Sequence, residues 1–264
     1  MLGAIIGDVV GSRFEWNNIK TKEFDLFTDD CFVTDDSVMT LAIAKAIMES
    51  DSNFENLSAK AVECMQKLGR KYPYCGYGGN FAGWLLSSNP KPYNSWGNGA
   101  AMRVSSVAYA GNTIEEIIEL SKKVTEVTHN HPEGIKGAEA TAIAIYMART
   151  GKSIQEIKDY INEHYYKIDF KLDDIRDDYK FDVSCQGTVP QALVAFFESV
   201  DFEDAIRNAI SLGGDSDTLA AITGSIAEAY YGISNKVRSY VFEFLDKYLK
   251  QILVEFENKF ILNK

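Results

Sequence analysis

Cysteine and proline are scarce in this 264-residue sequence, which contains only four and five of them. The cysteines are scattered without a paired CxxC spacing, so we expect neither a zinc site nor a secreted disulfide framework. Free thiols, buried or at the surface, fit this distribution better. The four residues concerned are Cys31, Cys64, Cys75 and Cys185.

Long apolar runs are also absent. No stretch approaches the roughly 18 to 20 apolar residues that a membrane-spanning helix needs. The apolar start of the chain has no basic residues before it, and Asp8 and Arg13 interrupt it, so it does not resemble a signal peptide. The sequence therefore predicts a cytoplasmic protein without membrane association.

Basic residues are too few to balance the acidic ones, with 27 against 38 and a formal net charge of -11. Such a surface repels polyanions and lacks the basic footprint of a general nucleic-acid binder. A small phosphorylated ligand is still compatible with this charge if metal ions or helix N-termini supply local positive charge.

Strand signals are nearly absent, whereas apolar residues recur at helical spacing along most of the chain. Only residues 166–183 alternate weakly, as a short ribbon would, and residues 72–98 form a long loop rich in glycine and aromatics. Without a linker or an internal repeat, the sequence predicts one all-α domain over residues 1–264, a compact bundle of many helices. The expected helices cover residues 37–50, 54–70, 100–110, 113–128, 133–150, 153–164, 189–199, 202–212, 218–231 and 235–250.

Two acidic segments, TDDS at residues 34–37 and GGDSDT at residues 213–218, precede two of these helices. Asp, Ser and Thr are common helix caps, so capping alone accounts for either segment taken singly. Each segment, however, offers two carboxylates and a threonine hydroxyl where a cap needs one oxygen. If the segments meet in space, four carboxylates crowd together and require cations, and oxygen ligands suit magnesium or manganese. Spacing alone does not show that they meet.

Five segments in order resemble the motifs of the ADP-ribosylglycohydrolase family: GAIIGDVVGSRFE, TDDSVMT, WGNGAAMRV, THNHPEG and LGGDSDTLAAITGSIAEAYYG. The resemblance runs from about residue 3 to residue 232. It implies an all-helical fold with a binuclear metal site at helix N-termini, holding two Mg²⁺ ions, with Mn²⁺ as the alternative. The implied metal ligands are Thr34, Asp35, Asp36, Asp215, Asp217 and Thr218.

The same resemblance implies a catalytic set of Glu15, Asp36 and Asp217. Glu15 matches a family carboxylate near the metals and the scissile bond, where a glutamate can position water or move a proton. Without the family match, Glu15 is an ordinary exposed glutamate at a helix end.

A glycine-rich loop aligns with the family segment that holds the diphosphate of ADP-ribose, and it consists of Ser95, Trp96, Gly97, Asn98 and Gly99. Backbone N–H groups of small residues reach phosphate oxygens, and Trp96 is expected to stack on the adenine, with a core position as the alternative. His129 is expected to line the phosphate or ribose cleft, whereas His131 has no assigned role. A metal role for the two histidines is rejected because no third soft ligand lies nearby.

The resulting hypothesis is a metal-dependent hydrolase that cleaves the C1″ bond of an ADP-ribosylated protein or small molecule and releases ADP-ribose. One alternative is a two-metal phosphoesterase or pyrophosphatase acting on a nucleotide. Another is a non-catalytic ADP-ribose-binding protein, because fold does not fix function. We expect a monomer. The acceptor is left open, because its recognition depends on residues 17–32 and 72–92, where the resemblance is weakest.

Overall fold

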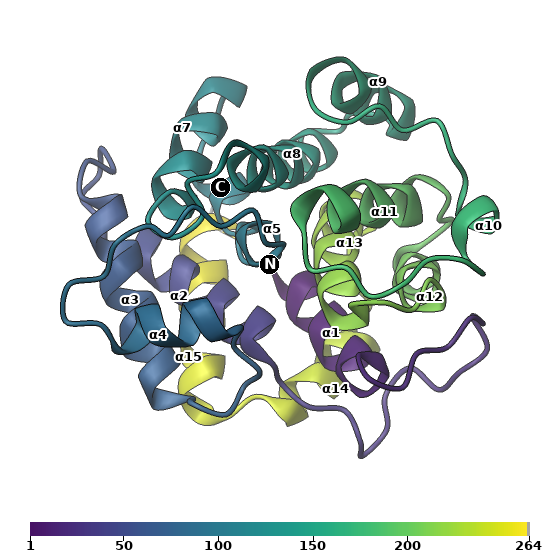
Figure 1. Ribbon diagram of the computed structural model, residues 1–264, viewed down its shortest axis with the longest axis horizontal. Coiled ribbons are helices and arrows are strands. Elements are labelled where there is room, and N and C mark those ends of the chain that lie inside the picture. Colours follow the sequence, from purple (N-terminus) through teal and green to yellow (C-terminus); the bar gives the residue numbers. More distant parts are fainter. Residues whose placement is uncertain (263–264) are drawn as a thin grey trace.

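Two helices from opposite ends of the chain, α1 (Leu2–Gly11) and α13 (Ser216–Tyr231), form the centre of the computed structural model, which describes residues 1–262 (Figure 1). Gly3, Gly7 and Gly11 recur every four residues and therefore share the face of α1 that meets α13. A Cβ atom at Gly7 would lie 2.0 Å from the carbonyl oxygen of Ala220, and one at Gly3 would lie 2.1 Å from that of Gly224. The two backbones can approach this closely only because the glycines have no side chains.

The remaining helices surround this pair (Figure 1). Near α2 lie α3, α4 and α15, whereas α7 to α9 and α10 to α12 cover the other sides. The bounds are η1 Ser12–Phe14, α2 Asp35–Glu49, α3 Leu57–Lys71, α4 Gly79–Leu86, α5 Gly99–Met102, α6 Val107–Ala110, α7 Ile114–Thr125, α8 Pro132–Arg149, α9 Ile154–His164, α10 Leu172–Ile175, α11 Cys185–Phe197, α12 Phe202–Ser211, α14 Asn235–Phe244 and α15 Lys247–Phe260.

The all-α prediction is confirmed, since residues 1–262 contain no strand and pack around one continuous apolar core. Two expected helices are each divided. Residues 100–110 form α5 and α6, separated at two consecutive serines, Ser105 and Ser106, which favour helix less than turns. Residues 235–250 form α14 and the start of α15, because Asp246 accepts hydrogen bonds from Tyr248 N and Leu249 N and caps a new helix.

The expected ribbon at residues 166–183 is wrong. This segment contains the short helix α10, and the described residues have a single isolated bridge, between Gly97 and Ser184. The long loop at residues 72–98 is also partly helical, because α4 lies within it. Among residues 1–262 no helix combines the length and the apolar character that crossing a membrane requires, and all four cysteines are free thiols.

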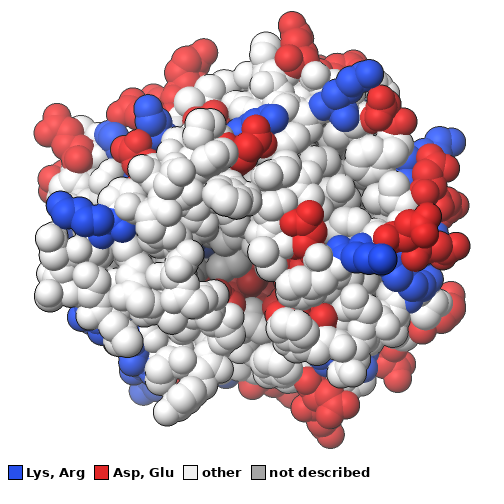
Figure 2. All heavy atoms as spheres, in the orientation of Figure 1, with Lys and Arg blue, Asp and Glu red and all other residues white. Residues whose placement is uncertain are grey.

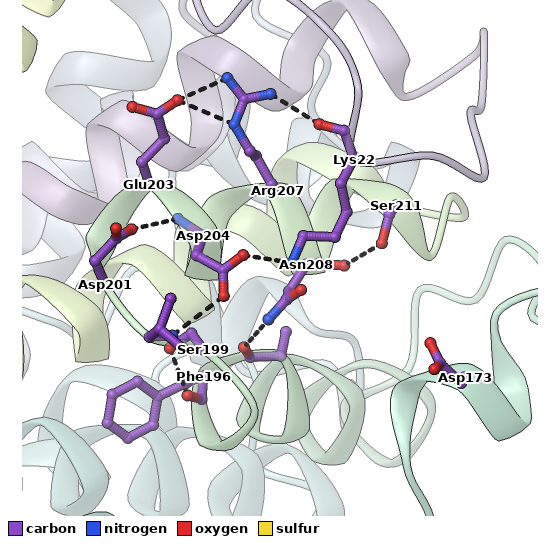
Figure 3. A network of polar contacts seen from close by, with 12 residues as sticks. Lys22, Asp173, Phe196, Ser199, Asp201, Glu203, Asp204, Arg207, Asn208 and Ser211 are labelled. Carbon is purple, nitrogen blue, oxygen red and sulfur yellow. Dashed lines mark hydrogen bonds and ion pairs between the residues drawn. The ribbon is translucent and has the colours of Figure 1, made fainter.

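The segment that follows η1 is fixed to α12 (Figure 3). Arg207 donates hydrogen bonds to the carbonyl oxygens of Lys22 (2.8 Å) and Phe24 (2.6 Å) and pairs with Glu203 on its own helix. Lys22 in turn forms an ion pair with Asp204. These contacts attach the first part of the loop between η1 and α2 to α12. The loop residues that precede Lys22 therefore have a defined position.

Replacing Gly7 by alanine should lower the free energy of unfolding by about 3 kcal/mol or prevent folding, because the new methyl group overlaps the α13 backbone. The matched control is Gly83→Ala in α4, where a Cβ atom meets nothing within 4 Å. That change should raise stability by about 0.5 to 1 kcal/mol, since alanine favours helix. Urea unfolding of both variants provides the measurement, and a wild-type midpoint for Gly7→Ala would contradict the close packing.

Candidate active site

The two acidic segments meet at the N-termini of α2 and α13. Thr218 Oγ1 donates a hydrogen bond to Asp36 Oδ2 over 3.2 Å, which joins the helices directly. Thr34 caps α2 by accepting from Asp36 N, so the carboxylates of Asp35 and Asp36 are not used as caps. Asp215 stands at the N-cap of α13 without a side-chain capping bond. The carboxylates that capping could have explained are therefore available for other contacts.

These side chains line a cavity of about 410 Å³. Figure 2 shows a hollow with acidic atoms near the centre of this face of the molecule. Asp35, Asp36, Asp215, Asp217 and Thr218 all contribute to its lining. Thr34 is buried behind them and is not among the lining residues.

Glu15 belongs to the same cluster. Its carboxylate and those of Asp215 and Asp217 each have an oxygen within 4.8 Å of the others, which is close enough to share one metal ion. Two buried oxygens, Asp36 Oδ1 and Asp217 Oδ1, have no hydrogen-bond partner among the described residues. Buried carboxylate oxygens without partners are costly, and a divalent cation with oxygen ligands would satisfy them. The residues present therefore fit a divalent metal site.

Burial and mutual repulsion shift the titration of the cluster. Burial, followed by the charges of Asp8 and Asp215, raises the pKa of Asp35 to about 8. Burial and then Asp215 raise the pKa of Glu15 to about 7. The pKa values of Asp36 and Asp217 lie well above the usual range, mainly because both carboxyls are buried. Near neutral pH the cluster holds protons or requires cations, because four adjacent negative charges are unfavourable.

Asp8 is a site residue for which the sequence analysis gave no role. Its side chain is fully buried and accepts from Thr34 Oγ1 (2.6 Å), Thr34 N (3.1 Å) and Ser37 N (3.1 Å). Burial raises its pKa to about 6. Asp8 thus fixes the hydroxyl of Thr34 and the start of α2. The sequence feature that could have identified Asp8 is an aspartate inside an otherwise apolar helix, because a buried carboxylate requires hydrogen-bond partners.

Two asparagines hold the second acidic segment. Asn98 Nδ2 donates to Asp215 Oδ2 (2.7 Å) and Thr188 Oγ1 (3.1 Å). Asn18 donates to the carbonyl oxygens of Glu15 (3.0 Å) and Gly214 (2.9 Å) and accepts from Gly214 N (2.7 Å). Gly214 has a φ of 71°, a conformation that glycine adopts without strain. Asn18 was not predicted, because its role depends on a segment nearly 200 residues away.

The glycine-rich loop forms another wall of the cavity, through Ser95, Gly97, Asn98 and Gly99, together with His129. Trp96 is not among the lining residues; it is half exposed, and its ring lies edge-on to His131 with centroids 5.3 Å apart. His131 caps α8, since its Nδ1 accepts from Glu133 N.

Aromatic and basic residues that were not predicted complete the wall. Trp16 and Phe181 stack with ring centroids 5.1 Å apart and are both exposed at the edge of the cavity. Phe81, Tyr93 and the buried Arg103 also line the cavity. The cavity therefore combines an acidic cluster with aromatic and amide-rich surfaces.

The all-helical fold and the acidic cavity are compatible with a hydrolase of glycosyl bonds, and the comparison with known proteins shows this class and the family. Residues 1–256 match the model of the ADP-ribosylglycohydrolase family. The chain belongs to this family, and its reaction is hydrolysis of an ADP-ribosyl bond.

Relatives with known names support this assignment. The chain is 24% identical to human ADP-ribosylhydrolase ARH3 over 319 residues, which covers 91% of this chain and 86% of the relative. It is 27% identical over 164 residues to the Pseudomonas putida ADP-ribosylarginine hydrolase Tri1, covering 58% of this chain and 42% of that one. A solved structure titled "ADP-ribosylglycohydrolase-related protein complex" matches with a TM-score of 0.71 at 20% identity, covering 97% and 95% of the two chains, and shows the same fold.

In EDTA, the free energy of unfolding should fall between about pH 6.5 and about pH 8.5. Asp35 and Glu15 titrate at about 8 and about 7 in the folded protein, above unfolded carboxyls. The folded state therefore binds more protons than the unfolded state in this window, and the stability from that binding is lost as pH rises through these values. Urea unfolding at several pH values measures the slope.

Asp35→Asn is the matched control, because it removes the group that titrates at about 8 and should flatten the slope. Added Mg²⁺ should oppose the loss, since a cation replaces the protons. Stability that rises over this window in EDTA would contradict the raised pKa values.

Proposed function

We propose that the chain uses two divalent metal ions to hydrolyse the bond between C1″ of the distal ribose of ADP-ribose and an acceptor, with free ADP-ribose as one product. The observation that carries this proposal is the convergence of two acidic helix N-termini, with unpartnered carboxylate oxygens, in a cavity that also contains the glycine-rich loop. Membership of the ADP-ribosylglycohydrolase family supports the reaction.

The proposed metal ligands lie on two segments and offer oxygen atoms only. They are Thr34, Asp35, Asp36, Asp215, Asp217 and Thr218. When bound, two such ions orient the substrate, stabilise developing charge and lower the pKa of water. Oxygen donors favour Mg²⁺, with Mn²⁺ as the alternative. Asp8 and Asn98 contribute indirectly, because they hold Thr34 and Asp215 in place.

Glu15 is the proposed group for positioning water or moving a proton, and Asp36 and Asp217 complete the catalytic set. Burial and the charge of Asp215 raise the pKa of Glu15 above its usual range in the metal-free protein. A glutamate beside the reacting bond is a chemically competent proton donor or acceptor. Its closeness to Asp215 and Asp217 places it beside the proposed metal ligands. A direct bond from Glu15 to a metal ion is the competing assignment.

The glycine-rich loop and His129 are proposed to bind the ADP part of the substrate. Ser95, Gly97, Asn98 and Gly99 present small side chains and backbone groups to the cavity. Trp96 does not line the cavity, but it lies in sequence between two lining residues, Ser95 and Gly97, and is half exposed, so it stays the proposed adenine-stacking residue.

The acceptor is the part of the substrate that the relatives do not fix, since one is named an ADP-ribosylarginine hydrolase and another simply an ADP-ribosylhydrolase. We propose an ADP-ribosylated protein or small-molecule conjugate as substrate for a monomeric cytoplasmic enzyme. The deciding experiment offers ADP-ribose linked to arginine, to serine, to a nucleic-acid base and to an acetyl ester, with Mg²⁺ or with EDTA.

Mass spectrometry of the products distinguishes the alternatives. ADP-ribose formed only with metal supports the proposal, and the preferred conjugate identifies the acceptor. AMP with ribose phosphate would instead identify a phosphoesterase or pyrophosphatase. Binding of ADP-ribose without turnover of any conjugate would identify a non-catalytic ADP-ribose-binding protein.

Glu15→Gln should leave metal affinity near the wild-type value and lower the single-turnover rate by roughly a hundredfold or more, the usual share of a positioned acid or base. Asp217→Asn should weaken metal binding itself, because it removes one negative charge while keeping the shape. Calorimetric metal titration and single-turnover assays of both variants show the split. If Glu15→Gln lost metal as strongly as Asp217→Asn, Glu15 would be a ligand instead.

A further inference from the structure

Arg103 is a buried cation in the cavity wall without a carboxylate partner. It is 1% exposed, and it forms no ion pair within residues 1–262. Its guanidinium lies 5.6 Å from the ring centroid of Phe81, and its Nη2 donates to Thr128 Oγ1 over 2.6 Å. A guanidinium can only donate hydrogen bonds, so Thr128 Oγ1 must accept here.

The hydrogen of the Thr128 hydroxyl then has two candidate acceptors. His129 Nδ1 lies 2.7 Å away, whereas the carbonyl oxygen of Thr125 lies 3.4 Å away. The Thr125 oxygen already accepts the backbone N–H groups of Thr128 and His129. Hydrogen bonds from hydroxyls are normally 2.5 to 3.0 Å long, so the geometry favours donation to His129 Nδ1.

The other ring nitrogen, His129 Nε2, faces the glycine-rich loop. A Cβ atom at Gly97 or at Gly99 would lie 3.5 Å from Nε2. His129 is 5% exposed and lines the cavity, and Nε2 forms no hydrogen bond within the described part of the chain. Burial, followed by the charge of Arg103, holds the pKa of His129 well below its usual range, so the ring is neutral. A neutral imidazole carries one proton, and the bond at Nδ1 decides which nitrogen holds it.

We infer that Thr128, oriented by Arg103, is a positioning residue that fixes His129 as the tautomer protonated at Nε2. His129 then presents an N–H donor to an unprotonated acceptor oxygen held against the loop at residues 97–99. On the proposed function, that oxygen belongs to the diphosphate of ADP-ribose. The donor is neutral, so it selects for an acceptor oxygen without adding a titrating positive charge near neutral pH.

The test replaces the Thr128 side chain while keeping its volume. Thr128→Val removes the hydroxyl and should release the tautomer, and Thr128→Ser should retain it. Thr125→Val is the matched control, because Thr125 is buried nearby and its hydroxyl has no hydrogen-bond partner among the described residues. Nitrogen-15 NMR of the imidazole rings in the ligand-free proteins measures the tautomer, with His131→Gln and His164→Gln variants to assign the signals.

Wild type, Thr128→Ser and Thr125→Val should show His129 protonated at Nε2 only, and Thr128→Val should show the proton shared with Nδ1. Calorimetric affinity for ADP-ribose should fall in Thr128→Val alone, by the inverse of the fraction of His129 that stays protonated at Nε2, which is about twofold for an equally shared proton. Thermal unfolding of each variant identifies any variant that does not fold. If Thr128→Val does not fold, Thr128→Ser decides the question, because loss of the Nε2-protonated tautomer in Thr128→Ser would overturn the inference.

A wild-type His129 protonated at Nδ1 would overturn the inference. Unchanged tautomer and affinity in folded Thr128→Val would do the same. If wild type does not bind ADP-ribose at all, the proposed function fails, yet the NMR result still decides the tautomer. The two failures are therefore distinguishable.

Discussion

The close contact between α1 and α13 is the constraint on which the rest of the structure depends. The side chain of Asp8 extends from α1 to Thr34 at the start of α2. The N-terminus of α13 brings Asp217 and Thr218 to the same end of α2. Because Asp8 ties α1 to the start of α2, moving α1 and α13 apart by a methyl group would also separate Thr218 from its hydrogen-bond acceptor Asp36. The stripe of glycines on α1 is thus a requirement of the site as much as of the packing.

The cluster of four aspartates at the N-termini of α2 and α13 serves the proposed reaction but lowers the stability of the fold. Four aspartates from two helices converge where burial raises their pKa values, and two of their oxygens have no partner in the described residues. A fold of this size is stable by only about 5 to 15 kcal/mol, so such a cluster is a large local cost. The surrounding hydrogen bonds from Asn98 and Asn18 keep the acidic segments in position despite that cost.

Sequence periodicity was enough for the all-α class and for most helices, because an amphipathic face leaves a local pattern. It fails where one capping residue overrides the pattern, as at Asp246, and where weak alternation at residues 166–183 predicts a ribbon that the structure does not form. The acidic segments were found because they are local motifs. Asn18 was missed because its partner Gly214 lies nearly 200 residues away, and no spacing rule reports such a contact. Asp8 left a local signal, an aspartate within an apolar helix, but neither this signal nor any pattern around Arg103 identifies the partners Thr34 and Thr128.

The pairing of α1 with α13 also bears on how the chain acquires its shape during synthesis. All ten residues of α1 are buried in the finished protein, yet their partner helix lies near the opposite end of the chain. As the polypeptide leaves the ribosome, this apolar helix must wait until almost the whole sequence has been made. Contacts between distant segments form slowly, and exposed apolar surface aggregates in the meantime. Late burial of α1 is therefore a consequence of building the cavity from two segments that lie more than 200 residues apart.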